Sequence, residues 1–191
     1  MDGDRRRFEE IYGAYSGLIL AYAARRTRGL DDAADVVAET FTVAWRRMDA
    51  VPAGEEARPW LYGVARRVVA NHHRGELRRR RLDERSAAEL GAAIVADGPE
   101  GDGQDHHRIA AALAALGDTD RELLTLVGWD GLEPAEIAVV LGTSAAAVRV
   151  RLHRARKRFA QALEVAGMQR TGTAGHGAAR WETAHLDPKD A

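Results

Sequence analysis

Apolar residues recur every three or four positions along most of the chain, the spacing that gathers side chains on one face of an α-helix. From about Arg5 to Arg26 this spacing predicts an amphipathic helix with an apolar stripe of Phe8, Ile11, Tyr12, Tyr15, Leu18, Ile19 and Tyr22. A second helix is predicted from Asp31 or Asp32 to about Met48, because acidic side chains stabilise the N-terminal end of a helix. Its predicted core positions are Val37, Phe41, Ala44 and Met48.

A loop over residues 51–58 precedes a third predicted helix, which begins at Pro59. The positions predicted to be buried in this helix are Trp60, Leu61, Val64, Val68 and Leu77, while its arginines face outward. Trp60 and Tyr62 lie beside many arginines, a combination that also stacks and holds single-stranded DNA. Spacing alone leaves both interpretations of these two aromatic residues open.

Helical periodicity then ends in a segment rich in glycine and acidic residues, which includes ADGPEGDGQD. This composition predicts a flexible acidic linker over residues 83–107, between small helical domains at 1–82 and 108–166. His106 and His107 adjoin the linker without other spaced ligands, so no metal site is predicted. Residues 167–191 lack sustained periodicity and are predicted to be a disordered tail.

The second domain is predicted to begin with a helical edge made of Ile109, Leu113 and Leu116. Thr119 and Glu122 have the spacing of a capping box for the next helix. Pro134 suits the first position of a further short helix, and Gly142 can adopt the left-handed conformation that ends it. The residues able to cap the last helix are Thr143 and Ser144, and its predicted inner face is Val148, Leu152 and Ala155.

Two helices joined by such a turn describe a helix-turn-helix, whose second helix enters the DNA major groove. The alternative is an ordinary helical hairpin with a solvated basic face. No acidic residue lies between Arg149 and Arg158 to balance the charge, and this favours DNA binding. The formal net charge of -1 does not oppose that prediction, because phosphate attraction acts locally, over a Debye length of about 10 Å.

Several classes of protein are disfavoured by composition. The chain has no cysteine, which excludes disulfides, thiolate zinc sites and cysteine nucleophiles and is compatible with a reducing cytoplasm. No apolar run approaches the roughly 20 residues that span a bilayer, and the start MDGDRRRFEE lacks the apolar core of a signal peptide. No Walker loop or spaced set of histidines and carboxylates appears. We therefore expect a soluble cytoplasmic protein that is not an enzyme and needs no cofactor.

Three motifs in a fixed order resemble a known family. They are DAADVVAETFTVAW from Asp32, RPWLYGVARRVVANHHR from Arg58 and, after the acidic linker, EIAVVLGTSAAAVRVRLHRARKRF from Glu136. Together they are similar to the extracytoplasmic-function sigma factors of the sigma-70 family. The resemblance implies that residues 1–82 are region 2 and residues 108–166 are region 4. It also implies a protein that binds core RNA polymerase, melts the −10 promoter element, recognises the −35 element and is commonly held inactive by an anti-sigma factor.

In that family the helix matching Asp32 to Met48 docks on the clamp helices of the polymerase β′ subunit, and region 4 is expected at the β flap. The residues that match this docking position are Asp35, Glu39, Phe41 and Trp45. Many members carry glutamine where this chain has Ala38. An acidic and partly apolar helix face is compatible with docking on a basic helical hairpin.

The loop from Met48 to Arg58 and the helix after it match the family's −10 reader and melting surface. A base leaves the stack there and enters a pocket while arginines hold the exposed strand. The matching residues are Trp60, Arg66, Arg67, Asn71, His72, Arg74 and Arg78. Asn71 stands where aspartate is common and Arg67 where asparagine is common, so the bases read at −10 are left open.

The last helix matches the reader of the −35 element. The resemblance places Arg149, Val150, His153 and Arg154 toward the bases, and arginine pairing with guanine is the commonest specific contact. It assigns phosphate contacts, which add affinity without selecting sequence, to Arg151, Arg156, Lys157 and Arg158. Ala147 and Val150 stand where hydroxyl residues are frequent.

Two rival functions remain at this stage. A helix-turn-helix repressor or response regulator, acting without polymerase docking, explains residues 133–158 but not the tryptophan- and arginine-rich helix after Pro59. A helical adaptor or anti-sigma-like protein predicts no DNA specificity in any context.

Overall fold

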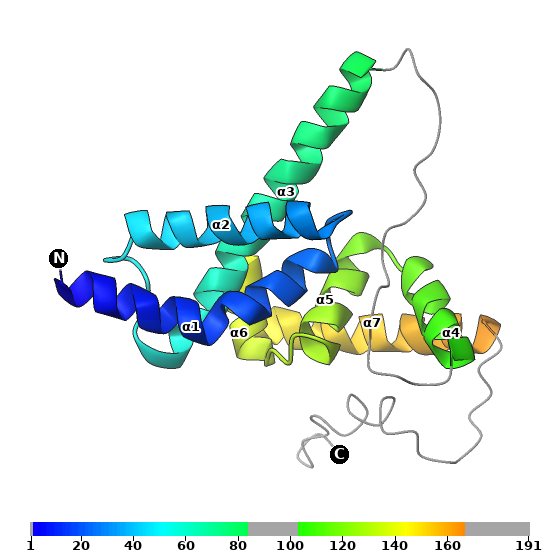
Figure 1. Cartoon of the computed structure of the whole chain (residues 1–191). Helices are drawn as coiled ribbons and strands as arrows, with labels where there is room; N and C mark the ends of the chain where they lie inside the picture. The colour runs from blue at the N-terminus through cyan, green and yellow to red at the C-terminus, as the bar shows by residue number, and fades with distance from the viewer. Residues whose placement is uncertain (1, 84–102, 167–191) are drawn as a thin grey trace. The chain divides into compact units, whose positions relative to one another are not determined.

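The computed structural model describes residues 2–83 and 103–166, which are entirely helical apart from the connections between helices (Figure 1). The helices are α1 (Asp2–Ala24), α2 (Leu30–Arg46), the short 3-10 helix η1 (Gly54–Glu56), α3 (Ala57–Asp83), α4 (Gly103–Ala114), α5 (Asp118–Gly128), α6 (Pro134–Leu141) and α7 (Ala145–Val165). Two compact units form, one built on α1, α2 and α3 and the other on α4, α5 and α7. The predicted all-α fold with two helical domains is confirmed.

Some predicted features lie outside the described residues. They are the tail at 167–191, most of the linker, and the side chains of Leu77, Arg78, His106 and His107. The predicted linker extended to residue 107, but α4 already begins at Gly103, so helical structure starts before the predicted domain boundary. None of the helices in the described ranges is long and apolar enough to cross a membrane.

In the first unit, α1 and α2 lie side by side and α3 packs against both (Figure 1). The rings of Tyr22 in α1 and Tyr62 in α3 meet edge to face, with centroids 5.2 Å apart. Both tyrosines are buried, so Tyr62 is a core residue and not part of a stacking surface. The guanidinium of Arg26 covers the Tyr22 ring at 3.8 Å, which shields this part of the core.

The predicted core of α2 is partly wrong. Val36 and Thr40 are buried, whereas Val37 is only half-buried, although Phe41, Ala44 and Met48 are buried as predicted. The buried face also includes Ala33, Val36 and Thr40, so it extends beyond the predicted face on one side. The sequence pattern did not show this because a buried threonine reads as polar in a hydrophobicity pattern.

The start of α3 also differs from the prediction. The helix begins at Ala57, two residues before Pro59, because η1 leads the chain directly into it. Gly54 in η1 has φ +61, a conformation that glycine adopts without steric cost. Pro59 then lies within the first turn, where its missing N–H needs no partner.

In the second unit, α7 buries Val148, Leu152, Ala155 and Phe159, which recur at spacings of four, three and four. The predicted inner face of this helix is therefore confirmed. Packed in the same unit are buried leucines of α4 and α5, which include Leu113, Leu123 and Leu126.

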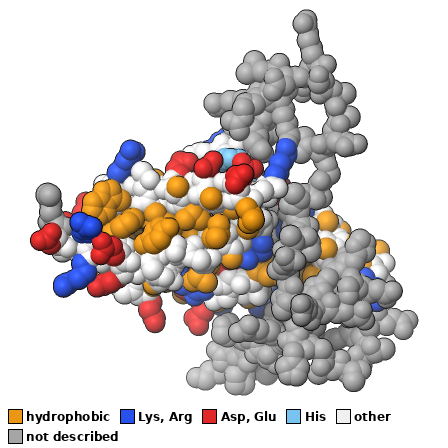
Figure 2. Space-filling view, viewed as in Figure 1, with side chains coloured by type: hydrophobic (Ala, Val, Ile, Leu, Met, Phe, Trp, Pro, Cys, Tyr) orange, Lys and Arg blue, Asp and Glu red, His pale blue; other side chains and the backbone are white. Residues whose placement is uncertain are grey.

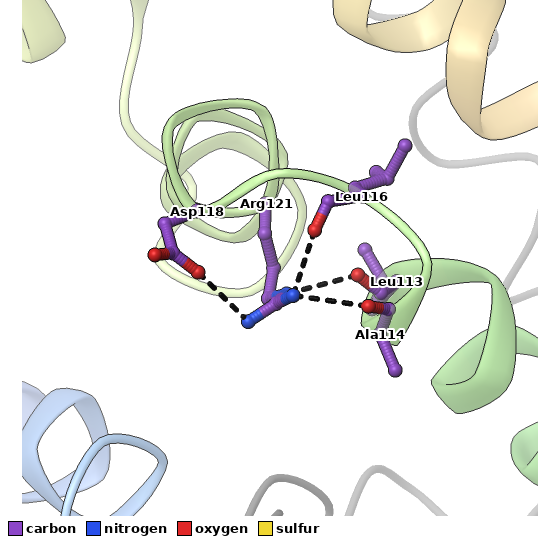
Figure 3. A network of polar contacts seen from close by, with 5 residues as sticks. All are labelled: Leu113, Ala114, Leu116, Asp118 and Arg121. Carbon is purple, nitrogen blue, oxygen red and sulfur yellow. Dashed lines mark hydrogen bonds and ion pairs between the residues drawn. The ribbon is translucent and has the colours of Figure 1, made fainter.

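The predicted Thr119–Glu122 capping box is wrong, because α5 begins at Asp118 after Gly117, which provides no side-chain cap. Arg121 instead joins α5 to the end of α4 (Figure 3). Its Nε donates to the Leu113 carbonyl at 2.9 Å, and Nη2 donates to the carbonyls of Ala114 at 3.1 Å and Leu116 at 2.7 Å. Nη1 lies 3.3 Å from Asp118 Oδ1. Carbonyls at a helix end lack intrahelical partners, so one guanidinium satisfies several of them.

We expect Arg121→Ala to loosen α4 selectively. Hydrogen bonds to a charged donor contribute about 1.5–3 kcal/mol, so amide hydrogen exchange in α4 should accelerate by about tenfold or more. Arg121→Lys should accelerate exchange by an intermediate amount, because a lysine ammonium lacks the planar fork of donors that reaches several carbonyls at once. Mass-spectrometric exchange on the full chain checks this, with α1 as the internal control. Unchanged protection of α4 would show that the Arg121 contacts contribute little.

Candidate functional site

The turn between α6 and α7 has the geometry of a helix-turn-helix. Gly142 has φ +63, and the amides of Gly142 and Thr143 donate back to the carbonyls of Val139 and Ala138. These two bonds form the Schellman motif that ends α6. Ser144 then caps α7, because its Oγ accepts from the Ala147 amide at 3.1 Å. The glycine-ended turn is therefore as predicted, and of the two candidate caps Ser144 is the one used.

The residues predicted to read the −35 bases lie on the exposed side of α7. At about 100° per residue, Arg149, Val150, His153 and Arg154 fall on an arc opposite the buried face of the helix. All four are exposed, and Val150 is 52% exposed although it is apolar. Lys157 falls on the same arc. The structure therefore brings the predicted base readers together on one surface.

The four predicted phosphate contacts divide into two groups. Arg151 and Lys157 are exposed. Arg158 is engaged by α5, because its Nη1 lies 2.5 Å from Asp120 Oδ2. Arg156 is half-buried and lines a pocket of about 460 Å³ together with Trp129, Asp130 and Leu152. Of the four, Arg151 and Lys157 are thus the better placed for phosphate.

On α3, three residues predicted for the −10 element form a row. Arg67, Asn71 and Arg74 are exposed and spaced by four and three positions, which places them on one face. Arg74 Nη2 donates to Asn71 Oδ1, so these two side chains are already coupled. Arg66 and Trp60 are half-buried beside this row.

The two histidines of α3 connect this helix to the rest of the first unit. His72 Nε2 lies 3.5 Å from Asp32 Oδ1 in the first turn of α2. His73 Nε2 lies 2.7 Å from the carbonyl of Arg26, just after α1. His72, predicted to contact DNA, is therefore half-buried and engaged within the unit. Among the described residues, no group of three histidine or acidic side chains is close enough to hold a metal ion.

The predicted docking residues of α2 also differ in their surroundings. Asp35 and Glu39 are exposed, and Trp45 is 49% exposed. Phe41 is only 3% exposed, because it lies under Tyr12 and Phe8, with ring centroids 4.8 and 6.2 Å away. Phe41 therefore supports the surface from beneath and does not form it.

Aromatic residues of α1 extend this surface, which the sequence reasoning missed. Tyr12 is 46% exposed, and Phe8 packs edge to face on Trp45 at 5.2 Å. Figure 2 shows hydrophobic side chains in a band over α1 and α2, with acidic side chains along its upper edge and further acidic side chains, mixed with basic ones, on its left and lower sides. The sequence did contain one signal for this surface, which is the width of the apolar stripe of α1. The stripe has seven residues, which is more than one helix buries against a small unit. Two of them, Tyr12 and Leu18, are exposed.

A helical unit with an acidic and aromatic face, followed along the chain by a helix-turn-helix, is the architecture of a small sigma factor. Comparisons with known families agree, because the family Sigma-70 region 2 matches residues 11–80 and the family Sigma-70, region 4 matches residues 106–159. The chain belongs to the extracytoplasmic-function sigma factors of the sigma-70 family.

Individual relatives support this assignment. RNA polymerase sigma factor CnrH of Cupriavidus metallidurans is 30% identical, with 85% of this chain and 89% of the relative covered. ECF RNA polymerase sigma factor BldN of Streptomyces coelicolor is 32% identical over 84% of this chain, which covers 62% of that longer protein. Among solved structures, the sigma factor RpoE in complex with the anti-sigma factor NepR, from Bartonella quintana, aligns with a TM-score of 0.64 at 25% identity. That alignment covers 84% of this chain and 98% of RpoE.

Proposed function

We propose that this protein binds core RNA polymerase and directs promoter-specific transcription initiation, with residues 1–82 acting as region 2 and residues 108–166 as region 4. The exposed arc of α7, which carries two arginines and a histidine over a fully apolar inner face, is the observation that carries the proposal. This arc reads the −35 element in the major groove. The row Arg67, Asn71 and Arg74 on α3 holds the separated strand at −10.

Polymerase docking is assigned to the acidic and aromatic face of the first unit. Asp35 and Glu39 supply negative charge for a basic helical hairpin such as the β′ clamp helices. Trp45 and Tyr12 supply exposed apolar area beside that charge. Phe41 supports Tyr12 from below, and Phe8 packs on Trp45. Tryptophan and tyrosine are common anchors of protein interfaces, so the aromatic pair contributes affinity while the carboxylates orient the partner.

An anti-sigma factor is the second proposed partner. The solved RpoE structure is a complex with the anti-sigma factor NepR. By similarity, we assign such a partner to this chain, where it competes with polymerase or DNA. The protein itself is assigned no catalytic step, and a cysteine-free chain suits the reducing cytoplasm where transcription occurs.

Run-off transcription with core RNA polymerase on a pool of promoter fragments tests the proposal. We expect new transcripts only when the protein is added, from promoters that share a −35 and a −10 element at fixed spacing. Specific binding to duplex DNA without polymerase, together with no binding to polymerase, would instead support a repressor. Such a repressor leaves the acidic and aromatic face of the first unit unexplained.

A further inference from the structure

Arg7 in α1 contacts the connection between α2 and α3. Its Nη1 donates to the Met48 carbonyl at 3.1 Å, and Nη2 donates to the carbonyls of Val51 and, at 3.1 Å, Pro52. These contacts join residues more than forty positions apart in the sequence. One guanidinium therefore fixes three carbonyls along five consecutive residues of the connection.

Apart from the Arg7 contacts, the connection is held at its two ends and by the short helix η1, which occupies Gly54–Glu56 and runs into α3. The Arg47 carbonyl accepts from the amides of Ala50 and Val51, which makes a tight turn after α2. Met48 and Val51 are buried within this turn, and Ala57 is buried where α3 begins. Residues 53–56 between these anchors are exposed. The base of the connection is fixed by Arg7 and buried side chains, while its tip faces solvent.

We propose that Arg7 is a positioning residue for the −10 element, which holds residues 48–52 so that the exposed tip at 53–56 meets an unstacked base in one conformation. This inference rests on the proposed function and on the family resemblance, which matches the loop from Met48 to Arg58 to the −10 reader. Ordering a free loop opposes binding, whereas a loop that is already ordered avoids that loss. Arginine suits this role because its planar fork directs several donors at separate carbonyls, which a lysine ammonium cannot do.

The simpler interpretation is that Arg7 only stabilises the end of α2, where a cation is favourable. The two interpretations predict different effects. A purely structural contact affects polymerase docking through α2 and DNA binding alike, because both surfaces belong to the same unit. A positioning contact affects capture of the −10 strand and leaves polymerase docking intact.

The test compares Arg7→Ala and Arg7→Lys with wild type in the full chain, assembled with core polymerase. Arg6→Ala is the matched control, because Arg6 is an exposed arginine on the same helix. One measurement is affinity for core polymerase, and the second is holoenzyme affinity for fork-junction DNA with a single-stranded −10 region. A third measurement is hydrogen exchange of residues 48–57 and of α2.

We expect Arg7→Ala to lower the affinity of the holoenzyme for fork-junction DNA by about tenfold. A loss of this size corresponds to at least one charge-assisted hydrogen bond. Affinity for core polymerase should stay within about twofold of wild type, as for a surface substitution, and Arg6→Ala should leave both affinities unchanged. Arg7→Lys should fall between wild type and alanine. Exchange should rise in residues 48–57 and not in α2.

Fork-junction affinity of Arg7→Ala equal to wild type would overturn the inference. So would an equal loss of polymerase affinity or faster exchange throughout α2, since either result assigns Arg7 a purely structural role. If the wild-type protein itself neither binds polymerase nor captures the fork, the proposed function fails and this inference fails with it.

Discussion

Replacing both Arg149 and Arg154 with alanine is expected to lower transcription from the cognate −35 element by about 100-fold or more. Each arginine that pairs with a base contributes about 1–3 kcal/mol of discrimination, and 1.4 kcal/mol corresponds to a factor of ten. Both side chains are exposed on the side of α7 opposite its buried face, so the fold should tolerate the change. Run-off transcription on the wild-type promoter and on −35 variants measures the loss and the change in preference.

Lys157→Ala is the contrasting variant on the same helix. Lys157 is exposed and is assigned to phosphate, so its removal should weaken binding to all −35 sequences by a similar factor. The slope of log affinity against log salt should also fall by about one. The arginine variants should instead relax preference at particular base pairs. If the double variant retained both activity and preference, the −35 assignment would be wrong and an adaptor without DNA specificity would become the better interpretation.

Local patterns predicted the helix-turn-helix well, because its features depend on nearby residues. Gly142 ends α6 in the left-handed conformation and Ser144 caps α7, and both follow from residue types within one turn of the chain. The inner face of α7 follows from spacing, because Val148, Leu152 and Ala155 are separated mainly by arginines and a histidine, with Val150 as the one exposed apolar residue between them. Sequence sufficed where a helix packs through one narrow stripe.

Tertiary contacts set the limits of sequence prediction. Arg121 and Arg7 bond to backbone carbonyls, which carry no residue-specific signal, so nothing in the sequence marks either arginine. Phe41 matched the docking position, but whether its ring faces a partner or the core depends on Tyr12 and Phe8 of another helix. A periodic pattern identifies an apolar face and does not show how much of that face neighbouring helices cover.

Charge reversal on α2 is the second large effect that we expect. The double substitution Asp35→Lys and Glu39→Lys should weaken binding to core polymerase by about 100-fold or more, because like charges across an interface cost several kcal/mol. Both residues are exposed and one helical turn apart, so they present to the same partner surface. Asp32 is left unchanged because it lies 3.5 Å from His72, and its loss would disturb the packing of α3.

Salt dependence identifies the cause of this loss. Screening shortens the Debye length from about 10 Å at 0.1 M salt to about 3 Å at 1 M, so the difference between wild type and the reversed variant should shrink as salt is raised. Trp45→Ala should also weaken binding, by about 30-fold for an aromatic anchor of 2 kcal/mol, but this loss should persist at high salt because it comes from apolar area. Fluorescence anisotropy of labelled protein titrated with core polymerase measures all three affinities.

Glu10→Lys is the control for an acid-to-lysine change outside the docking face, and it changes the net charge by half as much as the double substitution. Glu10 is exposed on α1, where helical spacing places it with exposed Arg6, Gly13 and Gly17 and away from Phe8 and Tyr12. It should therefore bind polymerase as wild type does. If Glu10→Lys weakened binding as much as the α2 reversal, the effect would come from net charge and not from a defined docking face. If the reversal left binding intact while Trp45→Ala abolished it, polymerase would dock through the aromatic residues alone, and the acidic edge would be free to serve another partner.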